Sequence, residues 1–202
     1  MLIAFPVIGY LFGSIPWGLV LTKKFTSVDI RQEGSGNIGA TNVRRVAGTW
    51  LGILTLAGDF TKGLIPVYLA TQMAGTEFVR YEIYGSTVAL SAFLGHLYPV
   101  FLGFRSGGKG VATAAGCFFV LSPFSCIVCI VVFILVVFFS RRVSAASLSA
   151  AAILPIAILV FTQSAIMTGF AVVTSAFIYF RHKDNIKRLV SGNEPTLWSR
   201  EK

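Results

Sequence analysis

Apolar runs that are long enough to cross a lipid bilayer take up most of this sequence, and short segments rich in glycine and basic residues separate them. Hydrophobic residues make up 55% of the chain and charged residues 12%, whereas an average soluble domain has roughly 25% charged residues. We therefore predict that residues 1–202 form a single all-α integral membrane domain. The formal net charge is +9, but the cations cluster between apolar runs. The expected partners are therefore the lipid bilayer and phosphorylated substrates, not nucleic acid.

Five apolar runs give seven predicted transmembrane helices. The runs are residues 1–22, 49–73, 83–102, 109–140 and 143–180. As a single helix with a rise of about 1.5 Å per residue, the fourth run would extend about 45 Å, against a hydrocarbon core of about 30 Å. We expect it to break into two spans at Pro123, and the fifth run to break likewise near residues 162–164. Pro16 and the small residues beside it should kink the first span.

Basic residues indicate the topology through the positive-inside rule. With seven spans and the N-terminus outside, the C-terminus is cytoplasmic. Of the Lys and Arg residues outside the spans, only Arg80 then faces the exterior. A five-span arrangement would move Arg141 and Arg142 outside and would need two overlong helices, so seven spans are favoured. Three polar segments then lie on the cytoplasmic side, namely residues 34–45, 95–113 and 181–195.

The first polar segment, residues 34–45, has the composition of an anion-binding loop. Its glycines expose backbone N–H groups, its short polar side chains add donors, and its arginines provide guanidinium groups that suit phosphate or carboxylate. It also matches the string Gly-x-Gly-x-x-Gly of dinucleotide-binding domains. That motif requires a preceding strand, whereas this segment follows an apolar helix, so a Rossmann domain is disfavoured. The candidate site residues are Ser35, Gly36, Asn37, Gly39, Thr41, Asn42 and Arg45.

The second polar segment contains a glycine-rich stretch, residues 103–113, that satisfies the pattern Gly-x-x-x-x-Gly-Lys. A nucleotide-binding P-loop is disfavoured, because Gly110 stands where magnesium would need Ser or Thr and no strand precedes the stretch. Backbone N–H groups and a lysine at the start of the next helix can still cradle a phosphate. The alternative is a basic turn that only anchors the topology. The candidate residues are Gly107, Gly108, Lys109 and Gly110, together with His96 in the preceding span.

The third polar segment opens the C-terminal tail, residues 181–202. Apolar residues recur at helical spacing in it, which predicts a short interfacial helix; the alternative is a basic tail that lies on anionic lipid. His182 and Asn185 are three residues apart and should share one face of that helix. The candidate residues are His182, Asn185, Arg188 and Glu194.

Two further pairs lie within the predicted spans. Asp59 and Lys62 are three residues apart and can pair on one helix face, either as a structural ion pair or as a support of the site. Cys126 and Cys129 have the spacing of a redox or metal pair, but thiols in apolar helices more often serve packing. We therefore predict no metal and no cofactor.

Three ordered blocks of this sequence resemble the motifs of a known enzyme family. The blocks are residues 35–45, 95–113 and 182–194. They are similar to the motifs of the bacterial acyl-phosphate:glycerol-3-phosphate acyltransferases, the PlsY family. The resemblance implies a seven-helix enzyme of the bacterial cytoplasmic (inner) membrane, with short interfacial helices and an active site on the cytoplasmic side. Such an enzyme transfers a fatty acyl group from acyl phosphate to the sn-1 hydroxyl of glycerol 3-phosphate. The products are lysophosphatidic acid and phosphate, in the first step of phospholipid synthesis.

The resemblance also gives the expected residue roles, and we expect one chain to act as a monomer. The expected catalytic residues are Ser35, Asn37, Thr41, Arg45, His96, His182 and Asn185. The expected phosphate-binding and substrate-binding residues are Gly36, Gly39, Asn42, Gly107, Gly108, Lys109, Gly110 and Arg188. The expected structural supports are Asp59, Lys62 and Glu194.

The chemistry of the residues agrees with this reaction. An acyl phosphate is already activated, so no acyl-enzyme is needed, and the enzyme has to position substrates and stabilise charge. The resemblance suggests that a departing phosphate oxygen takes the hydroxyl proton. The acyltransferase motif His-x-x-x-x-Asp is excluded, because its Asp position holds Phe101 after His96 and Lys187 after His182. A phosphate or organophosphate transporter and a lipid-binding scaffold remain alternatives, although a transporter usually shows internal repeats, and we find no convincing one.

Overall fold

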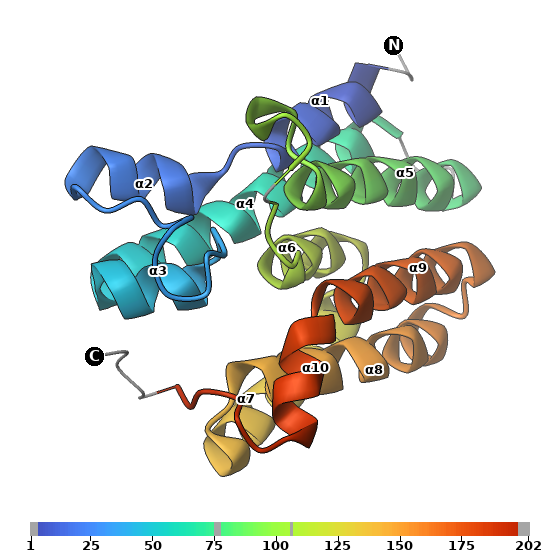
Figure 1. Ribbon diagram of the computed structural model, residues 1–202. Coiled ribbons are helices and arrows are strands. Elements are labelled where there is room, and N and C mark those ends of the chain that lie inside the picture. Colours follow the sequence, from blue (N-terminus) through green and yellow to red (C-terminus); the bar gives the residue numbers. More distant parts are fainter. Residues whose placement is uncertain (1–3, 75–77, 106, 198–202) are drawn as a thin grey trace.

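The computed structural model describes residues 4–74, 78–105 and 107–197, and this part of the chain is helical with no strand, as predicted. The elements are α1 (Ala4–Gly13), α2 (Trp17–Phe25), α3 (Ala40–Ala47), α4 (Thr49–Ala74), α5 (Phe78–Leu97), the 3-10 helix η1 (Val100–Leu102), α6 (Val111–Leu121), α7 (Pro123–Ser140), α8 (Val143–Thr162), α9 (Ala165–Arg181) and α10 (Lys183–Val190). Figure 1 shows their arrangement.

Four segments of the described chain are long and apolar enough to cross a membrane. They are α4, α7, α8 and Tyr81–Leu102, which joins most of α5 to η1. The bent pair of α1 and α2 would make a fifth span, whereas α6 and α9 are shorter apolar helices. These lengths fit a protein that lies within a bilayer, and the number of spans depends on whether α6 and α9 also cross.

Both predicted breaks in the long apolar runs are confirmed. The first lies between α6 and α7, where Pro123 has no N–H with which to continue a helix. The Val120 carbonyl near this break accepts a hydrogen bond from the Tyr81 hydroxyl at 3.3 Å. The second break lies between α8 and α9, where Gln163 has a left-handed φ of 52° and the side chain of Ser164 caps α9.

The first and third apolar runs differ from their predicted bounds. The kink predicted at Pro16 is confirmed as a 42° bend between α1 and α2, and α2 then continues to Phe25. The predicted third span, residues 83–102, begins too late, because α5 starts at Phe78, but its predicted end is confirmed, because the apolar span that joins α5 to η1 ends at Leu102. The polar residues in the first turns of α5 do not stop that helix. Helix α5 ends at Leu97 because the next residue precedes Pro99, and a residue before proline is disfavoured in the α region.

Helix α6 lies at the centre of the fold. Figure 1 shows α1, α4 and α5 on one side of it and α7, α8 and α9 on the other, and α6 contacts α4, α5, α7 and α9. Glycines bring α4 and α6 together. A Cβ atom at Gly63 would lie closer than 3.0 Å to the carbonyl oxygen of Thr113, and one at Gly116 would lie equally close to that of Phe60. The two backbones are therefore in direct contact.

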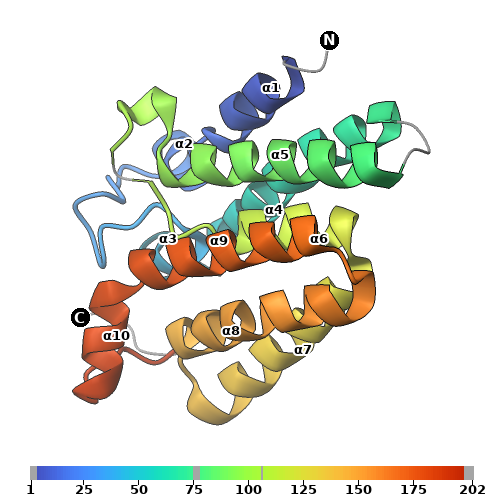
Figure 2. The same cartoon turned by 90° about the vertical axis from the view of Figure 1, so that its right-hand side faces the viewer.

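The polar connections gather at one end of these helices. Figure 2 shows residues 26–39, the connection that follows η1, and α10 at the same end, beside α3. A small core cluster seats residues 26–39 and α3 against α2 and α4. Its buried members are Leu19, Ile30, Ile38, Val43 and Leu51. All three polar segments of the sequence therefore lie at one end of the molecule.

Candidate active site

The glycine loop, residues 107–110, connects η1 to α6 and is held from two sides. From α5, the carbonyl oxygen of His96 accepts a hydrogen bond from the N–H of Gly108 at 3.2 Å. From the end of α9, the Arg181 guanidinium donates to the carbonyl oxygen of Gly108 at 3.1 Å and also to that of Gly107. The N–H of Gly108 is therefore committed to α5, which leaves it out of the predicted phosphate cradle.

A chain of short polar contacts connects the glycine loop to α10 and the tail. The Lys109 ammonium donates to the Oδ1 atom of Asn185 at 2.6 Å. The amide nitrogen of Asn185 donates to Oε1 of Glu194 at 2.6 Å, and Nε of Arg188 donates to Oε2 of the same carboxylate at 2.8 Å. Glu194 thus fixes the orientation of the Asn185 amide, and the amide in turn fixes the position of the Lys109 ammonium.

Three arginines lie close enough to Lys109 for their charges to act on its ammonium, and we call Arg45, Lys109, Arg181 and Arg188 the cation cluster. Burial lowers the pKa of Lys109 to about 8; the carboxylate of Glu194 opposes this shift, and the positive charges of Arg188, Arg181 and Arg45 add to it. The cluster draws on all three polar segments. Its excess of positive charge, partly withdrawn from water, makes this end of the molecule the candidate site for an anion.

The imidazole of His182 is neutral and presents an acceptor. Burial, followed by the positive charge of Lys109, lowers the pKa of His182 to about 4. Its Nδ1 atom lies 2.8 Å from the carbonyl oxygen of Ile178, so Nδ1 carries the proton and donates it. The Nε2 atom therefore has a lone pair with which it can accept a hydrogen bond from a substrate hydroxyl.

Asn42 organises the first polar segment from within. Its buried side chain accepts a hydrogen bond from the N–H of Ser35 at 2.9 Å. Its amide nitrogen lies 3.3 Å from the carbonyl oxygen of Ile30, 3.1 Å from that of Glu33 and 3.0 Å from that of Asn37. The side chain predicted to bind substrate is thus engaged in shaping the loop that precedes α3.

The other candidates in this segment lie around that loop. Gly36 has a φ of 66°, a conformation that favours glycine. The N–H of Gly39 donates to Oδ1 of Asn37 at 2.9 Å, just before α3 begins. The side chains of Ser35 and Thr41 are exposed. Of the first segment, Arg45 is the candidate that reaches the cluster.

The predicted pairing of Asp59 with Lys62 is confirmed at 2.8 Å, with both side chains buried. The Lys62 ammonium also donates to the carbonyl oxygen of Ile15 at 2.8 Å, at the break between α1 and α2. Next to this pair, Nδ1 of His96 lies 3.6 Å from Oδ1 of Asp59 and 3.2 Å from the hydroxyl of Thr113. His96 therefore lies beneath the glycine loop, between α4 and α6.

The tail crosses this end of the molecule as a strap, residues 194–197. The N–H of Leu197 donates to the carbonyl oxygen of Arg141 at 2.6 Å, and the carbonyl oxygen of Leu197 accepts from the Arg44 guanidinium. Arg142 donates to the carbonyl oxygen of Glu194 at 3.2 Å. The strap thereby joins α3 to the turn between α7 and α8.

Arg181, Thr113 and residues 195–197 of the strap were not among the predicted site residues. The sequence could have indicated Arg181 as a site residue, because it directly precedes His182 and follows the last apolar run at its predicted cytoplasmic end. Thr113 lies in the second polar segment, but its contact with His96 depends on how α6 packs on α5. The strap makes its contacts mostly through backbone atoms, which leave no signature in the sequence.

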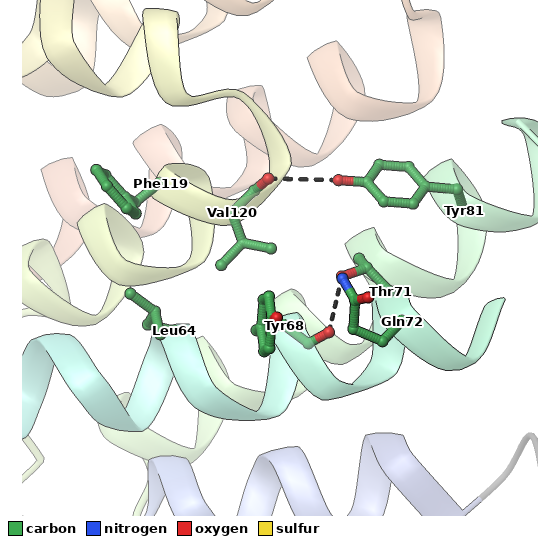
Figure 3. A pocket seen from close by; sticks show the side chains of 7 residues that line it. All are labelled: Leu64, Tyr68, Thr71, Gln72, Tyr81, Phe119 and Val120. Atoms are coloured by element: carbon green, nitrogen blue, oxygen red, sulfur yellow. Dashed lines mark hydrogen bonds between the residues drawn. The ribbon is translucent and has the colours of Figure 1, made fainter. Parts of the chain in front are cut away.

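Other features lie apart from the cation cluster. A pocket of about 480 Å³ lies between α4, α5 and α6 near the break at Pro123, and is lined mainly by apolar and aromatic groups (Figure 3). Tyr68 and Phe119 on its wall are about half exposed, as residues that face lipid would be. Among the described residues, no group of three or more His, Cys, Asp and Glu side chains could hold a metal ion.

Comparison with known proteins identifies the family. The family model described as glycerol-3-phosphate acyltransferase matches residues 3–192. A glycerol-3-phosphate acyltransferase from Geotalea daltonii is 47% identical over 185 residues, which cover 92% of each chain.

Two solved structures share the fold. The crystal structure of PlsY, an integral membrane glycerol 3-phosphate acyltransferase, in its glycerol 3-phosphate form has a TM-score of 0.89 at 37% identity, covering 96% of this chain and 94% of that one. Its lysophosphatidic acid form has a TM-score of 0.87 at 36% identity, with the same coverage. Sequence and fold therefore agree over nearly the whole chain, and the protein belongs to the glycerol-3-phosphate acyltransferase family of integral membrane enzymes.

Proposed function

We propose that this enzyme transfers a fatty acyl group from acyl phosphate to the sn-1 hydroxyl of glycerol 3-phosphate, and releases lysophosphatidic acid and inorganic phosphate. The observation that carries this proposal is the cation cluster around Lys109 at the polar end of an apolar helical bundle. Both substrates bring phosphate to that cluster, and the acyl chain remains among apolar helices. Solved relatives with glycerol 3-phosphate and lysophosphatidic acid in their names support the same substrate and product. We propose that one chain acts as a monomer.

The site favours direct transfer. The glycerol hydroxyl oxygen attacks the acyl carbonyl carbon, the bond from that carbon to the phosphate oxygen breaks, and the hydroxyl proton passes to the departing phosphate. Nε2 of His182 accepts a hydrogen bond from the attacking hydroxyl and orients it. With a pKa of about 4, His182 is a weaker base than the leaving phosphate, so phosphate is the better proton acceptor. Lys109 and the arginines stabilise the negative charge on the phosphates. Ser35, Asn37 and Thr41 supply donors for the carbonyl oxygen.

A reconstitution assay tests this function against its alternatives. Purified protein in liposomes receives acyl phosphate and radiolabelled glycerol 3-phosphate. We expect label in the lipid phase, whereas a transporter would put label in the lumen and a scaffold would do neither. With acyl-CoA as the only donor, turnover should be far slower, because nothing in the chain resembles an adenine or pantetheine site. Comparable turnover with acyl-CoA would contradict acyl phosphate as the direct donor.

We also propose seven spans, with the N-terminus outside and the active site on the cytoplasmic face of the bacterial inner membrane. In this arrangement α1 with α2 forms one bent span, α6 and α9 cross as short spans, and α10 lies at the interface. The gathering of the basic segments at one end supports it, since basic loops favour the cytoplasmic side. The exposure of Val190 at the end of α10 fits contact with the membrane surface.

Cysteine labelling tests this topology. In a variant without Cys117, Cys126 and Cys129, cysteines placed at the exposed positions Ser35 and Ser191 should react with an impermeant thiol reagent only from the cytoplasmic side. A cysteine at the exposed position Gln163, between α8 and α9, should react only from outside and serves as the control. A third polar-side position, Ser106, lies outside the described residues. Labelling of Ser35 or Ser191 from outside would contradict a shared cytoplasmic site.

A further inference from the structure

The glycine loop has no room for side chains on the side that faces α5. A Cβ atom at Gly107 would lie closer than 3.0 Å to the carbonyl oxygen of Leu97. One at Gly108 would lie equally close to Nε2 of His96, and one at Gly110 equally close to the ring of Phe93. Each of the three obstacles belongs to the last two turns of α5. The loop is therefore seated directly on the end of that helix.

The obstacle at Gly108 is a side chain whose position is fixed. The His96 ring is buried, with Nδ1 at 3.2 Å from the Thr113 hydroxyl and 3.6 Å from the carboxylate of Asp59. Asp59 is held in turn by its 2.8 Å pair with Lys62. The ring thus has contacts from α4 and α6 at one edge and the backbone of Gly108 at the other. It cannot swing aside without giving up one of these contacts.

The opposite side of the loop is clamped by α9. The Arg181 guanidinium holds the carbonyl oxygens of both Gly107 and Gly108, while the N–H of Gly108 is held by α5. Residues 107 and 108 therefore lie between His96 below and Arg181 above. Lys109 follows directly and must carry its ammonium to Asn185. A shift of the loop at Gly108 would displace that ammonium.

We propose that His96 is a positioning residue, whose ring fills the space of a side chain at position 108, seats the glycine loop and so places Lys109 in the cation cluster. This inference rests on the proposed function, and it gives a different reason for the glycine at position 108. Position 108 requires glycine because the His96 ring occupies the Cβ site, and the need for a phosphate to approach the backbone is not the cause. His96 therefore acts through Lys109 and does not contact the reacting atoms.

Mutual suppression between positions 96 and 108 tests the inference. Gly108→Ala alone should lower kcat/KM for glycerol 3-phosphate by about 100-fold or more, because the loop must lift off α5. His96→Ala alone should raise KM for glycerol 3-phosphate by about tenfold with a smaller change in kcat, because the loop loses its seat. In the double variant, the loss of the imidazole leaves room for the new Cβ atom at position 108. The double variant should therefore recover at least about tenfold of the kcat/KM lost by Gly108→Ala.

An absence of rescue in the double variant would contradict the inference. If phosphate must approach Gly108 closely, removing the imidazole restores nothing, and the double variant is at least as impaired as the two single effects multiplied together. That result would overturn the inference. Should Gly108→Ala fail to insert into the membrane, the amount of inserted protein becomes the readout, and His96→Ala should restore it.

Two glycine replacements serve as controls. Gly169→Ala on α9 adds a Cβ atom with nothing within 4 Å and should be neutral in both backgrounds. Gly116→Ala clashes with the carbonyl oxygen of Phe60, and His96→Ala should not relieve it. The melting temperatures of purified variants report the same rescue without any activity assay. If the wild-type protein fails to transfer acyl groups, the proposed function falls, whereas an absence of rescue in the melting temperatures contradicts the seating of the loop on its own.

Discussion

Replacing Lys109 with alanine is expected to raise KM for glycerol 3-phosphate by roughly 10–150-fold, with a smaller change in kcat. A charge-assisted hydrogen bond is worth about 1.5–3 kcal/mol, and about 1.4 kcal/mol corresponds to a tenfold change in affinity. KM carries the effect because the phosphate is bound equally in the ground state and the transition state. Arg45→Ala should be more harmful, since a bidentate guanidinium is lost. Lys187→Ala, an exposed lysine on α10, is the matched control and should leave KM unchanged.

The pH dependence of kcat/KM for glycerol 3-phosphate gives a second test of the role of Lys109. Its pKa of about 8 means that the ammonium of the free enzyme loses its proton as pH rises through this value. Affinity for the phosphate dianion should therefore be full well below pH 8 and should fall above it, so kcat/KM for glycerol 3-phosphate declines on the alkaline side. Lys109→Arg keeps its charge and should move this decline to higher pH.

A lysine that only anchored the topology would behave differently. Lys109→Ala would then lower the amount of correctly inserted protein, while the inserted fraction would show normal kinetics. KM must therefore be measured for each substrate on enzyme corrected for insertion. An unchanged KM for glycerol 3-phosphate would rule out a phosphate contact at Lys109.

The second large effect is expected at the buried pair of Asp59 and Lys62. Removing one partner leaves an uncompensated charge in the interior, which typically costs about 3–5 kcal/mol of stability. Lys62→Met and Asp59→Leu should each lower the melting temperature strongly. The double variant should be far less affected than either single one, because replacing a whole buried pair with apolar residues is often neutral or stabilising. Reversible unfolding of the purified protein, followed by denaturant titration, measures the three free energies.

The exposed pair of Asp29 and Arg31 provides the comparison. Its two side chains lie 2.7 Å apart on the surface, so Asp29→Asn should change stability little. If the double variant at positions 59 and 62 lost as much free energy of unfolding as the two single variants together, the two charges would not be coupled. Kinetics of the double variant also separate the two interpretations of this pair. A purely structural pair predicts normal KM values, whereas a support of His96 predicts a higher KM for glycerol 3-phosphate.

Local signals in the sequence predicted the local parts of this structure. The breaks at Pro123 and near residues 162–164 follow from span length and backbone chemistry, and both are present. The Asp59 and Lys62 side chains meet because a spacing of three residues brings them together on any helix. The start of α5 was missed because charged residues in its first turns resemble a turn, although a helix near a membrane surface tolerates them.

Contacts between distant segments could not be read in this way. Lys109 was a candidate from its own loop, yet its partner Asn185 is 76 positions away and is oriented by Glu194 after a further turn. Gly108 looked like a ligand-facing glycine, and only the packing of the loop on α5 reveals the His96 ring in its Cβ site. Such relations depend on how helices meet, which no spacing within one segment encodes.

The shortness of α6 has a consequence for how deep the glycine loop would lie in the membrane. From Lys109 to the end of α6, the chain rises about 20 Å, less than a hydrocarbon core of about 30 Å. Its far end is level with the first turns of α5, as the hydrogen bond from Tyr81 to Val120 shows. In the seven-span arrangement that we propose, the glycine loop would then lie about 10 Å inside the inner boundary of the hydrocarbon. A polar substrate would have to descend to it, while the acyl chain stays in the leaflet. The reduced access of water at that depth would shield the acyl phosphate from hydrolysis before the glycerol hydroxyl arrives.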